Sequence, residues 1–279
     1  MIIFKEAAAL SKYLTREQHK TGFVPTMGAL HDGHISLIKC ASLETETTVS
    51  SIFVNPTQFN DQKDYDKYPT SISQDIFMLE QSGCDVLFLP SVNEIYPAGL
   101  VSSIHYNLGV LENILEGKFR PNHFQGVCQV VHRLLEIVKP DVLYLGQKDY
   151  QQYLVLKRLV EQLGLPIEIR AVGTHREVTG LAMSSRNLRL SKADKDKATA
   201  IFDMLDYIKN NFESIDLRQL EKHATQYLLA HGFSNVNYVS IADAETLQPI
   251  DQVSAPKKAI ALIAASIGEV RLIDNILLN

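Results

Sequence analysis

Two histidines three residues apart mark the segment of the sequence best suited to chemistry. His31 and His34 lie in PTMGALHDGH (residues 25–34), where an apolar, strand-like run breaks into glycines and a segment with helical spacing begins. Gly28 and Gly33 let the backbone approach a ligand closely, and the first turn of the predicted helix offers unpaired N–H groups and the positive end of its dipole. Imidazole N–H groups at this point would donate hydrogen bonds to phosphate oxygens.

Two other interpretations of this pair are open. An isolated H-x-x-H is more often an ordinary pair of polar surface residues at the start of a helix than a functional site. A metal-binding pair at positions i and i+3 is the third interpretation. It is weakened because no third ligand, such as the glutamate of H-E-x-x-H, lies nearby in the sequence.

Polar residues also follow two other predicted strands. NPTQF supplies Asn55 and Gln58, and an amide that donates and accepts at once suits a substrate with both hydroxyl and carboxylate groups. GQKDYQQ supplies Lys148, which would neutralise a phosphate, and Asp149, which would bind ribose hydroxyls or a magnesium shell. Taken alone, NPTQF is equally compatible with an ordinary turn at the end of a strand, and for GQKDYQQ alone we favour a solvent-exposed Lys-Asp turn. We expect them to meet at one edge, because ligands bind outside the carboxyl ends of the strands in parallel sheets.

Two further segments concentrate cations or hydroxyls. AMSSRN (182–187) lies at a predicted domain junction, where a mobile segment with phosphate donors would suit a closing nucleotide site, although Ser-Ser-Arg is common in loops. EGKFRPNHFQG holds Lys118, Arg120 and His123 just before a predicted helix. These side chains would line a site for an anion or, as we favour, form a solvated loop.

Strand and helix patterns alternate through most of the chain. Near-continuous apolar runs, typical of strands covered by helices on both faces, predict a parallel, doubly wound α/β sheet of Rossmann type. We expect strands at 21–26, 47–56, 84–90, 141–149 and 166–173, and helices at 35–43, 71–83, 124–140 and 150–164. Ser71 or Ser73 would cap the helix that Gly83 ends.

The pattern changes after about residue 175. Two helices, over 191–211 and 217–233, precede strands at 236–244, 259–267 and 269–278, which predicts a smaller α+β domain. The predicted division is therefore 1–174 for a nucleotide- and substrate-binding domain and 175–279 for a C-terminal domain.

The composition of the chain excludes several classes of protein. The 279 residues are 46% hydrophobic and 21% charged, and a net charge of -5 with a pI near 6.0 argues against general binding to nucleic acid. Cys40, Cys84 and Cys128 are too widely spaced for a disulfide framework or a cysteine-rich zinc site. The N-terminal residues lack a signal-peptide pattern, and no apolar run reaches the roughly 18 residues of a membrane span. We therefore expect a cytoplasmic protein with small-molecule substrates, no membrane and no nucleic acid.

Together these segments resemble the pantothenate synthetase family, also called pantoate beta-alanine ligases, within the nucleotidyltransferase superfamily that shares an HxGH element. The matching segments are FVPTMGALHDGH, SIFVNPTQF, LEGKFRP-HF-GV, PDVLYLGQKDYQQ and GLAMSSRN, and the similarity covers nearly the whole chain. HxGH alone indicates only nucleotidyl transfer, and the other segments narrow the resemblance to this family.

The resemblance implies an enzyme that joins (R)-pantoate to beta-alanine with ATP and magnesium. The reaction would pass through a pantoyl adenylate and release AMP and pyrophosphate. It further implies a homodimer in which each chain has a Rossmann-like N-terminal domain and a smaller C-terminal lid.

Residue roles follow from the resemblance by position. It makes His34 the proton donor to phosphate, with His31 and Lys148 as catalytic partners. It assigns pantoate to Gln58 and Gln152, and beta-alanine to Gln58. Asp75 matches a recurrent aspartate that would help hold magnesium. The residues assigned to ATP are Met27, Gly28, Ala29, Leu30, His31, Asp32, Gly33, His34, Gly146, Gln147, Lys148, Asp149, His175, Met183, Ser184, Ser185 and Arg186.

Five positions depart from the family pattern. Thr70 replaces the usual arginine of Y-P-R, Asn122 the glycine of R-P-G-H-F, Gln147 the glutamate of G-E-K-D, Thr179 an aspartate and His175 a valine. None of these removes a residue assigned to the chemistry.

Three rival functions are also compatible with parts of the pattern. Another HxGH nucleotidyltransferase with a phosphorylated acceptor would carry cations where this chain has Gln58 and Gln152. A relative that charges tRNA or binds RNA is suggested by HDGH together with MSSR, but the acidic pI opposes it. A non-catalytic ATP sensor would bind ATP without releasing pyrophosphate.

Overall fold

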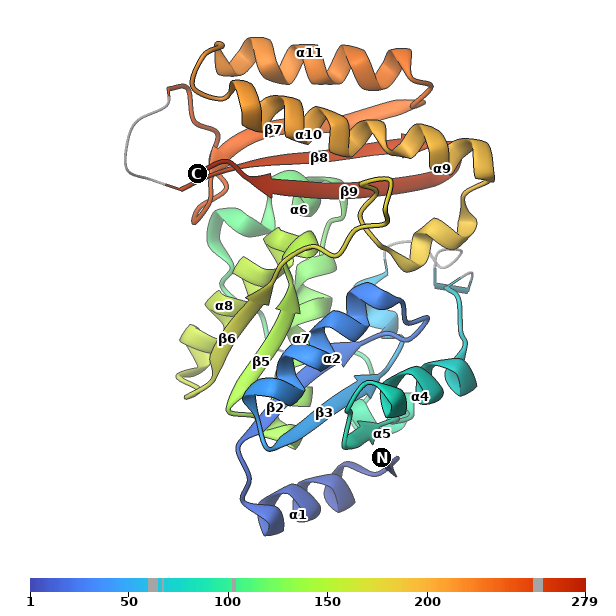
Figure 1. The fold of residues 1–279 in the computed structure, drawn as a ribbon. Helices are drawn as coiled ribbons and strands as arrows, with labels where there is room; N and C mark the ends of the chain where they lie inside the picture. Colours follow the sequence, from blue (N-terminus) through green and yellow to red (C-terminus); the bar gives the residue numbers. More distant parts are fainter. Residues whose placement is uncertain (60–64, 67, 102–103, 253–257) are drawn as a thin grey trace. The chain divides into compact units, whose positions relative to one another are not determined.

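A computed structural model describes residues 1–59, 65–66, 68–101, 104–252 and 258–279 (Figure 1). The chain divides into two compact units. The first contains Met1–Gly146 and Gln152–Gly173, and the second contains Gln147–Gln151 and Thr174–Asn279. A five-residue segment that follows the fifth strand therefore groups with the C-terminal part of the chain.

The first unit is built on a six-stranded parallel sheet in the order β1-β4-β3-β2-β5-β6. This sheet confirms the predicted Rossmann-like, doubly wound α/β fold. Its strands are β1 (Ile2–Phe4), β2 (Thr21–Thr26), β3 (Thr47–Ile52), β4 (Val86–Phe88), β5 (Val142–Gly146) and β6 (Glu168–Val172).

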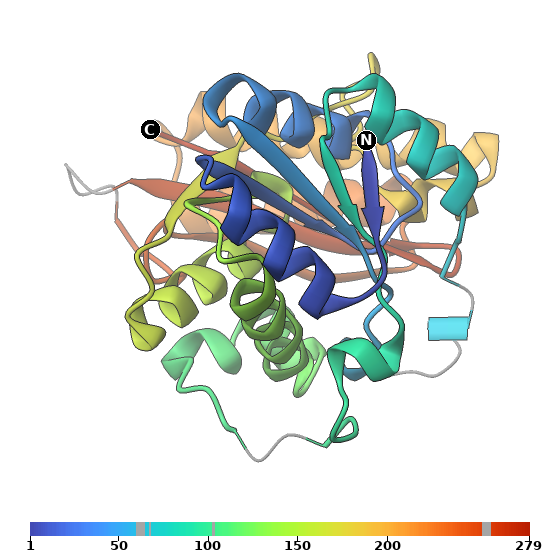
Figure 2. The same cartoon turned by 90° about the horizontal axis from the view of Figure 1, so that it is seen from below.

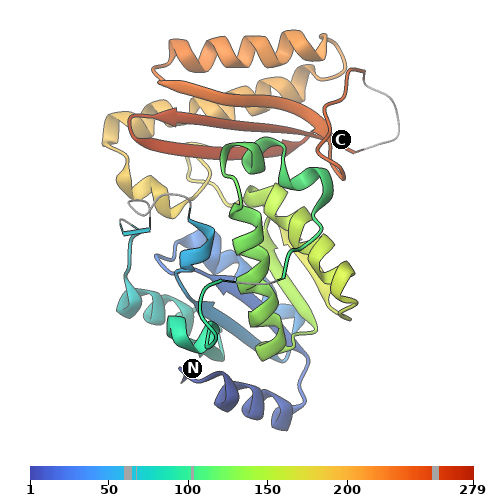
Figure 3. The same cartoon turned by 180° about the vertical axis from the view of Figure 1, so that it is seen from behind.

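Helices cover both faces of this sheet. Figure 1 shows α2 and α4 in front of the strands, and α7 and α8 lie in front in the reverse view of Figure 3. In Figure 2, α1 (dark blue) lies beside α7 (green), against which it packs. The helices of this unit are α1 (Ala7–Glu17), α2 (Asp32–Glu44), α4 (Ile72–Gln81), α5 (Val92–Ile95), α6 (Leu115–Phe119), α7 (His123–Val138) and α8 (Tyr150–Leu163), with 3-10 helices η1 (Pro56–Gln58) and η2 (Gly109–Glu112). The first two residues of α8 group with the second unit.

The direction of winding reverses between β2 and β5. The connection from β2 leads to β3 on one side, and the connection from β5 leads to β6 on the other. The pairing of β2 with β5 ends at Phe23, and Pro25, which has no N–H to donate, lies beyond the last pair. Such a reversal point is where α/β sheets bind ligands, and the histidine segment begins there.

Apolar packing explains why these elements form. Val24, Ile38, Leu79 and Leu87 are fully buried between the sheet and the helices α2 and α4. Tyr144 on β5 is also fully buried and donates its hydroxyl to Glu44 at 2.9 Å. The strands carry apolar residues on both faces because both faces are covered.

The second unit is an α+β structure, as predicted. Its antiparallel sheet has the order β7-β8-β9, and α10 and α11 pack against it (Figure 1). Leu205, Leu220 and Ile263 are fully buried in the core between helices and sheet. Its elements are η3 (Gln147–Asp149), η4 (Ser185–Arg189), α9 (Lys192–Ala198), α10 (Ala200–Asn211), α11 (Leu217–Ala230), β7 (Asn235–Asp243), β8 (Ala259–Ile267) and β9 (Val270–Leu277).

Some local expectations differ from the structure. The single helix predicted over 191–211 is two helices, which meet at Thr199. Ser71 precedes α4, but its hydroxyl caps no helix N–H and donates instead to Asp75 at 2.9 Å. Within the described residues no helix is long and apolar enough to cross a membrane. The functional division into a binding domain (1–174) and a lid (175–279) stays a prediction.

Replacing Gly126 by alanine tests the close approach of α7 to η1. In most helix interiors this change would stabilise the protein by up to about 1 kcal/mol. A Cβ at Gly126 would lie 2.2 Å from the carbonyl oxygen of Thr57, so we expect Gly126→Ala to lower the free energy of unfolding by about 1–3 kcal/mol. Urea unfolding measures the change. Gly173→Ala is the control, since a Cβ there meets no atom within 4 Å, and equal stability of both variants would contradict the packing.

The buried thiols supply a pH-dependent test. Burial raises the pKa of Cys84 and of Cys128 from 9.0 to about 12. The folded chain therefore keeps both protons where the unfolded chain loses them, and this contribution to stability is complete below pH 9 and is lost as the pH rises towards 12. At pH 8 we expect iodoacetamide to label neither thiol in the folded protein and both after unfolding. Mass spectrometry detects the label, and rapid labelling of Cys84 or Cys128 in the folded protein would show that the thiol is not buried.

Candidate active site

His31 and His34 form a reciprocal cap at the start of α2. His31 Nδ1 accepts a hydrogen bond from the Gly33 N–H at 3.1 Å, and His34 Nδ1 accepts one from the His31 N–H at 3.3 Å. The two rings lie 4.1 Å apart, centroid to centroid. Because each Nδ1 accepts, the neutral rings carry their protons on Nε2. The helix-start and phosphate-donor interpretations are therefore compatible, since they use different nitrogens of the same rings.

Asp75 on α4 holds the loop that precedes these histidines. Its carboxylate is 1% exposed and accepts hydrogen bonds from the N–H groups of Ala29 at 2.9 Å and Leu30 at 2.8 Å. Ala29 has a φ of 49° and Gly28 a φ of 83°, so two consecutive residues are left-handed. Such a backbone persists where surrounding contacts enforce it, and the carboxylate supplies them.

Gln58 is held between this loop and a buried amide network. Its Nε2 lies 3.0 Å from Met27 Sδ, and its Oε1 accepts from Asn55 Nδ2 at 3.2 Å. Asn55, 1% exposed, also donates to the carbonyl of Gly126 at 3.1 Å and accepts from the hydroxyl of Tyr96 at 2.7 Å. Burial raises the pKa of Tyr96 to about 12, which keeps this hydroxyl a donor. The structure thus brings the NPTQF and PTMGAL segments together.

His123 does not belong to a solvated loop, so that interpretation was wrong for this residue. Its side chain is 5% exposed, and its Nδ1 lies 2.7 Å from the carbonyl oxygen of Gln58. Arg120 Nη1 lies 3.0 Å from Nε2 of the same ring. Because guanidinium only donates and carbonyl only accepts, both contacts are satisfied by a neutral ring protonated on Nδ1. Lys118, by contrast, is exposed as expected.

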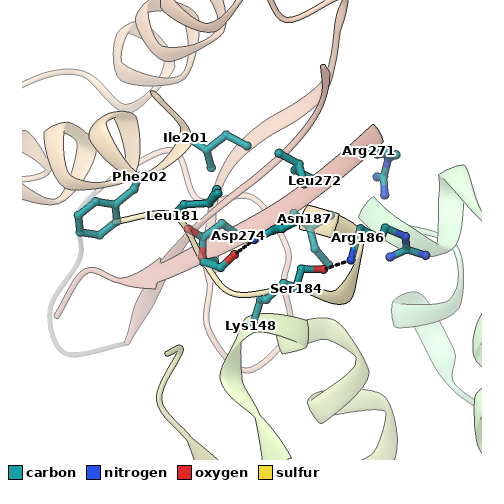
Figure 4. Close-up of a pocket in the computed structure, with 12 residues that line it drawn as sticks. Lys148, Leu181, Ser184, Arg186, Asn187, Ile201, Phe202, Arg271, Leu272 and Asp274 are labelled. Carbon is teal, nitrogen blue, oxygen red and sulfur yellow. Dashed lines mark hydrogen bonds between the residues drawn. The ribbon is translucent and has the colours of Figure 1, made fainter. Parts of the chain in front are cut away.

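The second unit holds the other candidate cations. Lys148 in η3 is 15% exposed, and its Nζ lies 3.5 Å from Asp149 Oδ1. Ser184 precedes η4, and its hydroxyl accepts from the Arg186 N–H at 3.3 Å. Lys148, Ser184 and Arg186 line one small cavity of about 10 Å³, enough for about one water (Figure 4).

An ion pair with a buried carboxylate lies beside this cavity. Arg176 Nη1 lies 2.5 Å from Asp274 Oδ2, and Nη2 lies 3.1 Å from Oδ1. The guanidinium also stacks over the ring of Phe202 at 4.4 Å. Burial raises the pKa of Asp274, and Arg176 opposes that shift. Asp274 also lines the cavity (Figure 4).

Comparisons with known proteins identify the family. The model of the pantoate-beta-alanine ligase family matches residues 2–277. Pantothenate synthetase of Dehalococcoides mccartyi is 44% identical, with 92% of this chain and 95% of that protein covered, and pantothenate synthetase of Cytophaga hutchinsonii is 44% identical, with 94% and 93% covered.

Two solved structures agree with this result. A crystal structure of pantothenate synthetase from Thermus thermophilus has a TM-score of 0.92 and 39% identity, covering 100% of this chain and 99% of that one. Pantoate-beta-alanine ligase from Francisella tularensis, complexed with beta-gamma ATP and beta-alanine, has a TM-score of 0.84 and 40% identity, covering 100% and 98%.

The chain belongs to the pantoate-beta-alanine ligase family.

Within this ligase chain, the predicted site residues fall into two sets, one in each unit. The first unit contains Gly146 at the end of β5 and Gln152 in α8, and it joins Gln58 and Asp75 to the segment from Met27 to His34. In the second unit Lys148 lines a cavity with Ser184 and Arg186, and the Met183 N–H donates to the carbonyl of His175 at 3.0 Å. The roles assigned to these residues stay predictions.

Three residues make contacts near the candidate site that the sequence did not predict. Asp75 was expected to act through magnesium, whereas its described contacts are to the loop. Asn275 donates to the carbonyls of Gln147 at 3.0 Å and Lys148 at 2.8 Å, which lie 128 and 127 residues earlier in the chain. The His123 ring forms a hydrogen bond with the backbone carbonyl of Gln58. Contacts over such separations leave no spacing pattern in a single sequence.

Substituting Asp75 tests how the loop is held. In Asp75→Asn one carboxylate oxygen becomes an amide donor that faces a backbone N–H, so we expect the free energy of unfolding to fall by about 1–3 kcal/mol. Ser71→Ala is the matched control, because it removes one hydrogen bond to the same carboxylate and leaves both backbone N–H groups paired. Urea unfolding compares the two. A loss in Asp75→Asn no larger than in Ser71→Ala would count against the loop-holding role.

Proposed function

We propose that this ligase joins (R)-pantoate to beta-alanine with ATP, through a pantoyl adenylate, and releases AMP and pyrophosphate. The observation that carries the proposal is the pair of imidazoles at the start of α2 whose Nδ1 atoms accept backbone N–H groups, which leaves Nε2 to donate, in a chain of this family. The N-terminus of a helix with N–H donors favours phosphate. The Francisella tularensis relative was solved with an ATP compound and beta-alanine, which supports the same substrates here.

The first step needs positive charge more than a strong base. A pantoate carboxylate attacks the α-phosphate, so two anions must approach and charge grows on the phosphate oxygens. We assign His34 Nε2–H as the donor to the reacting phosphate, with His31 beside it. Lys148 and Arg186 would spread the remaining charge. The full ATP set is the one named by resemblance, from Met27 to His34, Gly146 to Asp149, His175, and Met183 to Arg186.

Pantoate would be oriented by amides. Gln58 is 9% exposed and held by Asn55, so its amide is preorganised by the network rather than by the ligand. We assign pantoate to Gln58 and Gln152, and beta-alanine to Gln58. Amides suit a neutral hydroxyl beside a carboxylate, whereas a phosphorylated acceptor would need cations there.

The second step is attack of the beta-alanine amine on the acyl adenylate. An alkyl ammonium near the lysine pKa of about 10.4 is mostly protonated at neutral pH, so we propose that its small neutral fraction reacts. Water must be kept from the adenylate meanwhile, and we assign this lid function to the C-terminal unit.

The described residues offer magnesium no ready protein cage. The described residues contain no group of three or more histidine, cysteine, aspartate or glutamate side chains that would hold a metal. Both oxygens of Asp75 already accept backbone N–H groups. Magnesium is commonly bound by substrate phosphates and water with only one or two carboxylates, so we propose that it enters with ATP, and we derive no step through it. A homodimer in the cytoplasm completes the proposal.

Paired substitutions at His34 separate its two nitrogens. The amide oxygen of asparagine can replace Nδ1 in the helix cap but offers nothing at Nε2, whereas the amide nitrogen of glutamine reaches the Nε2 position. We expect His34→Asn to slow adenylate formation by about 10²-fold or more, and His34→Gln to lose less. Pyrophosphate release from ATP and pantoate measures this step.

The same assay tests the function as a whole. AMP and pantothenate should form only when ATP, pantoate and beta-alanine are all present, whereas an ATP sensor would release no pyrophosphate. His223→Ala, an exposed histidine on α11, is the control and should match the parent chain. Unchanged turnover in His34→Asn would overturn the role of His34, and no pantothenate from the parent chain would overturn the proposed function.

A further inference from the structure

The segment that carries Lys148 is fastened by the last strand of the chain. Asn275 on β9 is 2% exposed, and its Nδ2 donates to the carbonyl oxygens of both Gln147 at 3.0 Å and Lys148 at 2.8 Å. Two carbonyls can only accept, so the orientation of this amide is fixed by its partners. One side chain therefore holds two consecutive peptide groups next to the candidate catalytic lysine.

Asn275 is itself held by the buried ion pair. Its N–H donates to Asp274 Oδ1 at 2.8 Å, and Asp274 is paired with Arg176. Its own Oδ1 is buried and has no hydrogen-bond partner within the described part of the chain. The side-chain nitrogen of Asn275 thus satisfies two carbonyls of η3, whereas its side-chain oxygen is left buried without a partner. An unpaired buried oxygen costs free energy, so packing alone does not explain an asparagine at this position.

Two glycines lie where the chain passes from the first unit to the second. Gly146 ends β5 and Gly173 follows β6, and the chain passes between the units directly after each of them. A Cβ at either position would meet no atom within 4 Å, and neither has a positive φ, so neither packing nor conformation in this structure demands glycine. Within the second unit, the two hydrogen bonds from Asn275 attach η3 to β9.

We infer that Asn275 is a positioning residue that sets the place of Lys148 for the ligase reaction. This inference rests on the proposed function, because it needs Lys148 to act on the phosphates. Asn275 acts through the peptide groups at 147 and 148, and a misplacement of about 1 Å can cost about 10²-fold in rate.

A double-mutant cycle tests the inference, with pyrophosphate release at saturating ATP and pantoate as the readout. We expect Asn275→Ala to slow adenylate formation by about 10- to 100-fold when Lys148 is present. In the Lys148→Ala chain the same change should cost less than about twofold, because a residue that acts only through Lys148 has nothing left to position. A general structural role would lower both rates by the same factor.

Two controls match the change. Asn211→Ala removes another asparagine whose Nδ2 donates to a backbone carbonyl, that of Tyr207 at 2.8 Å, on α10 of the same unit. Ile208→Val weakens the core of that unit without touching η3. Both should keep the parent rate. If Asn275→Ala does not fold, Asn275→Ser, which retains one donor, is measured in the same two backgrounds.

The outcomes separate the two proposals. Equal factors in the two backgrounds, or no effect of Asn275→Ala where Lys148→Ala is slow, would overturn the positioning role and leave the proposed function intact. Parent-like activity of Lys148→Ala would overturn the role of Lys148, and the inference with it. The expected result is that Asn275→Ala lowers the rate of pyrophosphate release only in the chain that contains Lys148.

Discussion

The carboxylate of Asp75 is the contact on which the first half of the site depends. It fixes two backbone N–H groups of a loop that contains two left-handed residues, and the loop delivers the chain to the start of α2. Without a buried acceptor, a backbone of this kind would relax, because left-handed conformations of residues such as Ala29 are costly. The direction in which the two histidines enter their helix follows from that loop.

The histidines then combine structure and chemistry in single side chains. A serine or aspartate would cap α2 equally well through its oxygen. Imidazole adds a second nitrogen on the far side of the ring, and the cap on Nδ1 decides that this nitrogen carries the proton. The helix cap is therefore also the device that sets the tautomer, and a separate residue to orient each ring is unnecessary.

The fold and the chemistry of individual segments could be predicted from the sequence, but the contacts between distant segments could not. Apolar runs separated by amphipathic helices predicted the parallel sheet, because periodicity is local and survives in a single sequence. The polar segments after β2, β3 and β5 could be expected at one edge once the strands were parallel. The short first strand and α1 gave no comparable signal, and three residues of Ile2–Phe4 are too few to show a period. His123 looked like part of a charged loop, since nothing local shows that its partner is a carbonyl 65 residues earlier.

Lys148 is a further residue whose contacts differ from what its place in the sequence suggests. Its position in the sequence, just after β5, suggests that the first unit's sheet places it. The hydrogen bonds link its carbonyl instead to Asn275 on β9, and the Asn275 N–H donates to Asp274 of the Arg176–Asp274 pair. Asp274 is buried in this pair, and an ion pair of this kind contributes little net stability compared with apolar packing. Under the proposed function this pair would have a positional role, because the second unit attaches the lysine that is proposed to act on the phosphates.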